Sequence, residues 1–327
     1  MTVNKRFSVA RAASSACVAL LLSSRSLSGQ TGYYNLDSGR PMRIEDAIPT
    51  ELREIELQFL PLRGERVSDG TERFRLEPKI AYGVLPRTEV EVRVPLMDVR
   101  VPNSTESVGI ASVAVGALHA FDVETGMVPA FAIAAELVAP AGSLSAPIGS
   151  YSVKGLLTKT LPFGRVHLNV GAGTWSARVP TSSSTAGTLC GNAPGVPPCM
   201  IPDVPCNVVP SSNAAVSPNY FCAPAVTAQA AAVPGAPPAT GAHWTAGIAF
   251  DHTLPMISTL FAADLVVDRF ARLYPLDDWT AELGVRHQLT PELIADGGVA
   301  RRFAGTTQST SIVIGISYSA PLRALFH

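Results

Sequence analysis

The stretch REIELQFL, residues 53–60, alternates charged or polar side chains with apolar ones. The same alternation returns in RFRLEPKIAY at residues 73–82 and in EVEVRV at residues 89–94. Successive side chains of a strand point to opposite faces, whereas a helix would scatter these charges around its circumference. The three stretches therefore predict three successive β-strands, each with one apolar and one charged face.

Nine further segments repeat the pattern less sharply, so that the chain carries about twelve predicted strands of about ten residues. These segments are residues 108–119, 130–139, 151–160, 165–175, 244–252, 258–269, 278–288, 292–303 and 309–318. Strands that span a membrane need about 9–11 residues, whereas strands of soluble sandwiches usually have about 5–6. We therefore expect an all-β fold, a transmembrane antiparallel β-barrel of about twelve strands.

The connectors between the predicted strands alternate in length. Those after even-numbered strands are tight: residues 83–88, 124–129, 161–164, 253–257 and 289–292. Those after odd-numbered strands are longer or more variable: residues 63–72, 97–107, 140–150, 179–243 and 270–277. Outer-membrane barrels have short periplasmic turns and longer outer loops. We therefore expect the long connectors on the outside and both ends of the barrel chain in the periplasm.

The composition agrees with a protein whose outer surface is partly apolar. Of the 327 residues, 47% are hydrophobic and 16% are charged, and the formal net charge is −1. Soluble domains usually have about 25% charged residues. The chain has no excess of basic residues that would indicate binding to nucleic-acid phosphates. A membrane-spanning helix needs about 20 apolar residues, and no apolar stretch of the sequence is that long.

Residues 1–28 have the three parts of a secretory signal peptide. A basic start precedes a short apolar run at residues 16–22, and small side chains follow at a plausible cleavage position. The basic residues are Lys5, Arg6 and Arg11, and the small ones are Ser26 and Ser28. This pattern predicts export.

Four cysteines lie within residues 179–243, a segment rich in Pro, Ala, Ser and Gly: Cys190, Cys199, Cys206 and Cys222. An even number in an exported chain favours disulfides, of which three pairings are possible. Zinc is less favoured, because no Cys-x-x-Cys pair or nearby His supplies the usual ligand spacing. We expect an outer loop held by two disulfides. It either covers the pore mouth or is a surface excursion without a function of its own.

Two segments resemble a known family: GRPMRIEDAIPTELREIELQFLPL at residues 39–62 and EPKIAYGVLPRTEVEVRV at residues 77–94. Residues 116–140 and 152–170 are also similar. The family comprises outer-membrane transporters associated with the meta-cleavage pathway of phenol degradation. The resemblance implies an outer-membrane barrel with a transport role. The cysteine-bearing segment departs from the family's pattern.

The charged faces of the predicted strands are candidates to line the lumen. The candidates are Glu54, Glu56, Arg73, Arg75, Glu77, Lys79, Glu89, Glu91, Arg93, Glu136, His167, Asp264, Glu282 and Arg286. They predict a polar constriction that selects small solutes. The alternative is a lumen filled with salt bridges that conducts little. The strand number does not decide between these alternatives: barrels of about eight strands have a packed interior, those of about 16 strands hold a channel, and twelve lies between.

Residues 29–49, before the barrel of residues 50–327, are too polar to face lipid. They predict a periplasmic N-terminal segment, and the alternative is a lumen insert that pairs with the charged faces. We favour the periplasmic tail.

Taken together, these patterns predict passive passage of small solutes, aromatic or amphipathic ones among them. A plugged structural or surface-interaction barrel is the alternative. An outer-membrane enzyme is less favoured, because no Gly-x-Ser-x-Gly motif or His-x-Ser-Asn cluster occurs. We expect no cofactor, no metal and no nucleic-acid partner. The expected partners are outer-membrane lipid, a small-molecule solute and the barrel-assembly machinery.

Overall fold

A computed structural model describes residues 34–37, 39–59, 61–102, 106–177, 207–208, 220–221, 239–271 and 276–322. The expected signal peptide at residues 1–28 lies outside the described residues. So do the four candidate disulfide cysteines, Cys190, Cys199, Cys206 and Cys222.

Sixteen strands form one sheet that closes on itself, because β1 pairs with both β4 and β18. Their bounds are β1 (Glu54–Gln58), β2 (Leu62–Val67), β3 (Glu72–Leu76), β4 (Lys79–Leu85), β5 (Thr88–Arg93), β6 (Leu96–Arg100), β7 (Ser107–Ile110), β8 (Ser112–Asp122), β9 (Ala130–Pro140), β10 (Ser150–Leu161), β11 (Gly164–Ala177), β14 (Ala239–Leu254), β15 (Thr259–Phe270), β16 (Asp278–Thr290), β17 (Leu293–Ala304) and β18 (Ser309–Pro321). The short strands β12 (Asn207–Val208) and β13 (Tyr220–Phe221) pair only with each other, and η1 (Pro255–Ile257) lies in a turn.

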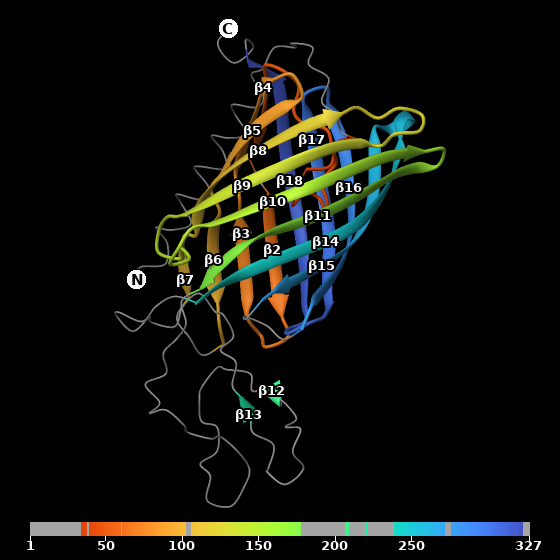
Figure 1. The fold of residues 1–327 in the computed structure, drawn as a ribbon. Helices are drawn as coiled ribbons and strands as arrows, with labels where there is room; N and C mark the ends of the chain where they lie inside the picture. Colours follow the sequence, from red (N-terminus) through yellow and green to blue (C-terminus); the bar gives the residue numbers. More distant parts are fainter. Residues whose placement is uncertain are drawn as a thin grey trace, which may run out of the picture.

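The first eight strands form four barrel strands, each made of two parts in line. β1 continues into β2, β3 into β4, β5 into β6 and β7 into β8. Both parts pair with the same neighbouring barrel strands in the first three, whereas β8 pairs with β5 and β9 and β7 pairs with β6 alone. With the eight continuous strands they make a closed antiparallel barrel of twelve strands, the number that the alternation predicts (Figure 1).

A row of prolines separates the two parts of the first three barrel strands. Proline has no backbone N–H, so it interrupts the ladder of hydrogen bonds. The proline carbonyl oxygens nevertheless accept hydrogen bonds from the neighbouring strand. The Pro61 oxygen accepts from the Glu77 N–H at 3.1 Å, that of Pro78 from Val94 at 3.2 Å, and that of Pro95 from Ala111 at 2.9 Å. Neighbouring strands therefore remain hydrogen-bonded at the level of the prolines.

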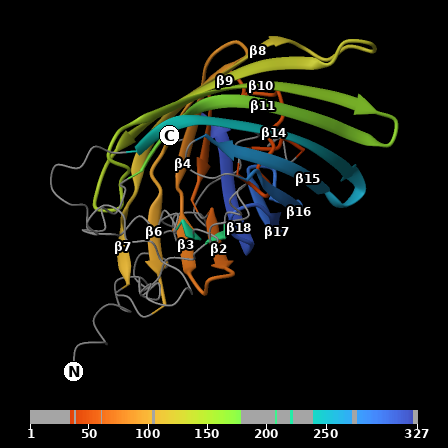
Figure 2. The same ribbon diagram turned by 60° about the horizontal axis from the view of Figure 1, so that its bottom comes forward.

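Two of the parts beyond the row, β2 and β6, were expected to lie in the connectors 63–72 and 97–107, and this prediction is wrong. Residues 62–67 and 96–100 are strands, because the alternation resumes after each proline and the chain continues to pair with the same neighbours. β2, β3, β6 and β7 reach the end of the barrel that comes forward in Figure 2. This extra length forms one wall of the lumen.

The outer face of the barrel is apolar. Large hydrophobic side chains in the middle of the strands are more than half exposed, including Ile248, Leu283, Val299 and Ile312. An exposed apolar band on a closed barrel is the surface that a lipid bilayer covers. No helix among the described residues is long and apolar enough to cross a membrane.

The connectors 101–106, 141–149, 178–238 and 271–277 follow strands that end at one side of the barrel, the lower side of Figure 1, whereas the seven-residue connector 123–129 lies at the opposite side. The opposite side has tight turns, such as residues 86–87, 162–163 and 291–292. β14 begins at Ala239, so the last five residues of the expected loop 179–243 belong to a strand.

Candidate functional site

Residues 34–50, apart from position 38, lie inside the barrel and are here called the inner segment. Three of its apolar side chains are fully covered: Leu36, Met42 and Ile44 pack against Leu260 and Val266 of β15. Figures 1 and 2 place its red-to-orange trace among the strands. The segment folds back on itself, because the Leu36 N–H donates to the Asp46 carboxylate and the Asp46 N–H donates to the Leu36 carbonyl, both at 3.0 Å.

Glycines on the inward face of the barrel make room for this segment. A Cβ atom at Gly284 of β16 would lie 2.5 Å from Cγ of Pro41, and one at Gly247 of β14 would lie 2.5 Å from Cδ1 of Ile44. Glycine permits such a close approach because it carries no side chain. The barrel wall is therefore shaped to fit the inner segment.

Buried ion pairs hold the first half of the inner segment. The Arg40 guanidinium is 3.3 Å from the Asp296 carboxylate, and it donates to the Ser317 hydroxyl at 2.9 Å. Asp37 accepts from Arg286 at 3.0 Å and lies 3.8 Å from the Lys79 ammonium. Buried charges are stable only when paired, and here each partner comes from a different part of the barrel.

Carboxylates of β15 and β16 bind the middle of the inner segment. The Arg43 backbone N–H donates to Glu282 at 2.6 Å and to Asp264 at 3.1 Å, and the Ile44 N–H also donates to Asp264, at 3.2 Å. The Arg43 side chain reaches Asp268 at 2.5 Å. The backbone is thus anchored as firmly as the side chain.

The second half of the inner segment contacts the opposite wall. Glu45 pairs with Lys154 of β10 at 2.5 Å, and Asp46 lies 3.6 Å from Arg165 of β11. Further along, the Thr50 N–H donates to Glu89 of β5 at 2.6 Å. The inner segment therefore spans the lumen from wall to wall.

A Thr–His–Asp array lies where the second half of the inner segment meets β10, β11 and β14. The Thr158 hydroxyl is 3.0 Å from Nδ1 of His167, and Nε2 of His167 is 2.9 Å from Asp251. Hydrolases use arrays of this kind, with an accessible hydroxyl. Here the Ala47 N–H donates to the Thr158 hydroxyl at 2.9 Å and His167 is fully buried. In this arrangement the array anchors the inner segment.

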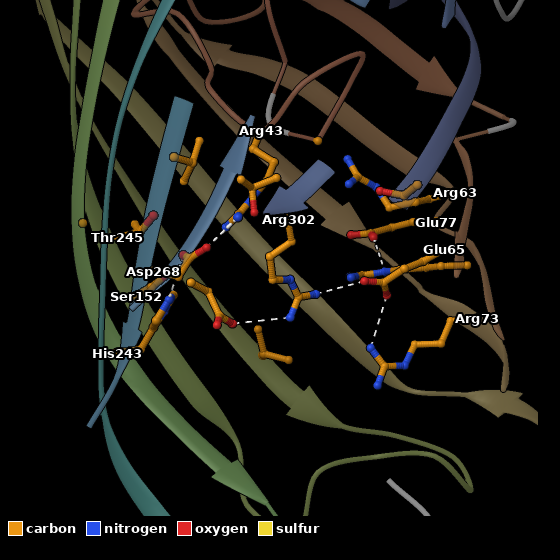
Figure 3. A pocket seen from close by; sticks show the side chains of 18 of the residues that line it. Arg43, Arg63, Glu65, Arg73, Glu77, Ser152, His243, Thr245, Asp268 and Arg302 are labelled. Atoms are coloured by element: carbon orange, nitrogen blue, oxygen red, sulfur yellow. Dashed lines mark hydrogen bonds and ion pairs between the residues drawn. The ribbon is translucent and has the colours of Figure 1, made fainter. Parts of the chain in front are cut away.

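Two cavities lie on either side of the inner segment. The first, about 840 Å³, opens among charged side chains of β2, β3, β14, β15 and β17 (Figure 3). The second, about 670 Å³, lies towards the tight turns and has a more apolar lining that includes Ile48, Leu52 and Val123. Arg40 and Arg43 border the first cavity, and residues 47–52 border the second. The inner segment is therefore the partition between them.

Known proteins share the fold but not the sequence. No family model matches the chain, and neither does any curated protein. The crystal structure of an outer membrane channel from Pseudomonas putida F1 is 10% identical, with a TM-score of 0.55 over 87% of this chain and 100% of that one. The NanC porin is 9% identical, with a TM-score of 0.46 over 80% of this chain and 98% of its own. The KdgM porin is 10% identical, with a TM-score of 0.40 over 81% of this chain and 98% of its own.

At this identity the comparison with the Pseudomonas channel bears on the fold alone, and it agrees with the closed sheet and the apolar exterior. The chain is an outer-membrane β-barrel. This conclusion concerns the fold and does not extend to the phenol-degradation pathway with which the similar family is associated.

Within this outer-membrane barrel, most of the candidate lumen residues lie in the interior. Six border the first cavity: Arg73, Arg75, Glu77, Lys79, Arg93 and Glu136. Five contact the inner segment: Glu56, Glu89, Asp264, Glu282 and Arg286. Glu91 bridges Lys79 and Arg93, at 3.1 and 3.3 Å. His167 is covered, and Glu54 lies at the tight-turn end of β1, outside the lining of both cavities.

Among the charged residues of the first cavity's lining that the sequence did not single out are Arg63, Glu65, Asp268, Asp278 and Arg302. Arg63 and Glu65 lie in residues 63–72, which the sequence predicts to be a connector, and Arg302 lies in β17, which holds no candidate. Asp268 and Asp278 each share the face of a candidate, because Asp268 lies four residues from Asp264 and Asp278 lies four from Glu282. Extending the alternation to the strand ends would have found them.

Proposed function

We propose that this barrel is a narrow outer-membrane channel for small solutes, with the inner segment as its constriction. The observation that carries the proposal is the pair of cavities, about 840 and 670 Å³, that approach the inner segment from its two sides. Large open porins have no such partition, whereas a packed barrel has no such cavities. Solutes would pass where the segment meets the wall, and their size would be limited there.

The two linings differ in a way that suits amphipathic solutes. The first cavity is bordered by many charged side chains. The second exposes mainly apolar surface, and the charged residues of its lining are Glu51, Arg87, Asp122, Glu124 and Arg165. A small molecule with an aromatic or aliphatic part and a polar group would find a partner for each part along the path. We include such solutes in the proposal.

The other parts of the chain complete the proposal. Residues 1–28 would direct export, the barrel-assembly machinery would insert the barrel into outer-membrane lipid, and Cys190, Cys199, Cys206 and Cys222 would form two disulfides in the outer loop. The mass of the exported protein, measured before and after reduction and alkylation, tests the cleavage and the disulfides together.

Conductance of the refolded mature protein in a planar bilayer tests the channel. We expect small, steady single-channel currents from the complete chain. Deletion of residues 29–45 removes most of the partition, so the conductance should rise several-fold. Heat-modifiable mobility on gels verifies that each protein is folded. Silence of both folded proteins would contradict the channel and leave a structural barrel, and equal conductance would show that the inner segment is not the constriction.

A further inference from the structure

The lining of the first cavity has an excess of positive charge. Nine Arg and Lys side chains border it, against six Asp and Glu side chains. The basic ones are Arg40, Arg43, Arg63, Arg73, Arg75, Lys79, Arg93, Lys154 and Arg302, and the acidic ones are Glu65, Asp69, Glu77, Glu136, Asp268 and Asp278. The chain as a whole is slightly acidic, with a formal charge of −1. The excess is therefore local.

At three pairs of this lining the cation is more exposed than the carboxylate with which it pairs. The Arg75 side chain is 45% exposed and its partner Glu77 is 18% exposed, while Arg43 is 33% exposed and its partner Asp268 is 6% exposed. Arg73 and Glu65 show the same order. At these three pairs the guanidinium is the more accessible group, so a solute beside them meets mainly positive charge.

Two carboxylates of this wall are each shared by two arginines. Glu65 accepts from Arg73 at 3.2 Å and from Arg302 at 2.9 Å, as Figure 3 shows. Glu77 contacts Arg75 at 2.6 Å and Arg93 at 3.0 Å. Arg302 and Arg93 have further acidic partners, namely Asp278 for Arg302 and Glu91 and Glu136 for Arg93. Among the described residues, Arg73 and Arg75 form ion pairs only with these shared carboxylates.

We infer that the first cavity is an anion-selective vestibule, in which Arg73 and Arg75 attract small anions and small carboxylates above all. The inference rests on the proposed channel function and names its solute class. A guanidinium presents a planar fork of donors that matches a carboxylate in a bidentate manner. A charged wall inside a low-dielectric barrel also raises the local concentration of the oppositely charged solute.

The selectivity can be measured as a reversal potential across a bilayer with a tenfold KCl gradient. We expect the complete protein to reverse towards the chloride equilibrium potential. In water, one unit charge about 7 Å from an ion changes that ion's local concentration about two- to threefold. The double variant Arg73→Gln and Arg75→Gln should therefore lower the ratio of chloride to potassium permeability about fivefold or more.

Arg100→Gln provides the matched control. Arg100 lies over the ring of Phe74, pairs with Asp98 and Glu106, and is not among the residues that line the first cavity. This variant loses the same kind of charge, and its permeability ratio should equal that of the unchanged protein. An equal shift in the control would mean that the net charge of the protein, and not the vestibule, sets the selectivity.

Binding of benzoate to the folded protein in detergent, measured by calorimetry, separates this inference from the channel itself. Currents that favour potassium or neither ion overturn the inference and leave the channel standing. A silent bilayer overturns the channel; benzoate binding that the double variant weakens would then support the anion site alone. Silence together with no benzoate binding overturns both.

Discussion

Arg40 shows how a single residue holds the inner segment. Its side chain is 2% exposed, and it contacts Asp296 at 3.3 Å and Glu56 at 3.9 Å while donating to Ser317. Loss of one partner from a buried ion pair leaves the other charge uncompensated, which costs more than the pair contributed. Arg40 therefore couples β1, β17 and β18 to the inner segment.

At this scale we expect Arg40→Met to loosen the inner segment without unfolding the barrel. The unpaired carboxylate of Asp296 should weaken the docking by about 2 kcal/mol, which corresponds to roughly thirtyfold more frequent local opening. Tryptic cleavage after Arg43, followed by mass spectrometry, reports that opening. Arg100→Met is the control, and cleavage of Arg40→Met at the rate of the unchanged protein would contradict the role of Arg40.

At the scale of elements, the inner face of the barrel is matched to the inner segment by small residues. A Cβ atom on Gly284 of β16 would lie 2.5 Å from Cγ of Pro41 and 3.2 Å from Cγ of Met42. All three of its nearest contacts belong to the inner segment and none to the strands. Added volume at this position should therefore act on the segment and not on the pairing of the strands.

We expect Gly284→Val to displace the inner segment and to raise the conductance, because an extra isopropyl group cannot share the space of Pro41. Gly297→Val is the matched control: a Cβ atom at Gly297 of β17 has as its nearest contact the Val313 carbonyl oxygen, at 3.6 Å. Single-channel recordings compare the two. Equal single-channel currents in the two variants would contradict the displacement of the inner segment, provided that both variants show the gel mobility of the folded barrel.

At the scale of the whole molecule, the barrel separates a lipid phase from an aqueous one. Leu283 in the middle of β16 is 62% exposed on the outer face, whereas Thr245 of β14 borders the first cavity. An alternating strand carries one kind of side chain to each phase, so the cost of a charge depends on the face that receives it.

We therefore expect Leu283→Arg to lower the free energy of unfolding by about 2–4 kcal/mol, the usual cost of Arg at the bilayer midplane of a barrel. Thr245→Arg, which adds the same group to the water-filled side, should cost much less. Urea unfolding in lipid vesicles measures both. A similar loss for the two variants would mean that the face of β16 here assigned to lipid does not meet it.

Much of the architecture follows from the order of residues alone. The strand number, the antiparallel course and the inward face of Arg73, Glu91 and Glu282 depend on an alternation that is local and needs no partner. Two of the alternating stretches end at Pro61 and Pro95, and the sequence therefore predicts connectors where β2 and β6 continue. The stretch at residues 73–82 alternates across Pro78, and there a strand is predicted on both sides. Pro61, Pro78 and Pro95 lie at the same height in three neighbouring strands, and only the folded sheet shows this.

The position of the inner segment could not be obtained in this way. Residues 34–50 are polar in sequence, and a polar stretch suits water as well as a lumen. Their place depends on Arg40 meeting Asp296, on Arg43 meeting Asp268 and Glu282, and on the gap at Gly284, partners more than 200 residues away. Such complementarity is a property of the closed barrel, because only closure brings the inward faces of distant strands around one space. The alternation thus specifies the wall, and the assembled tertiary structure specifies what the wall encloses.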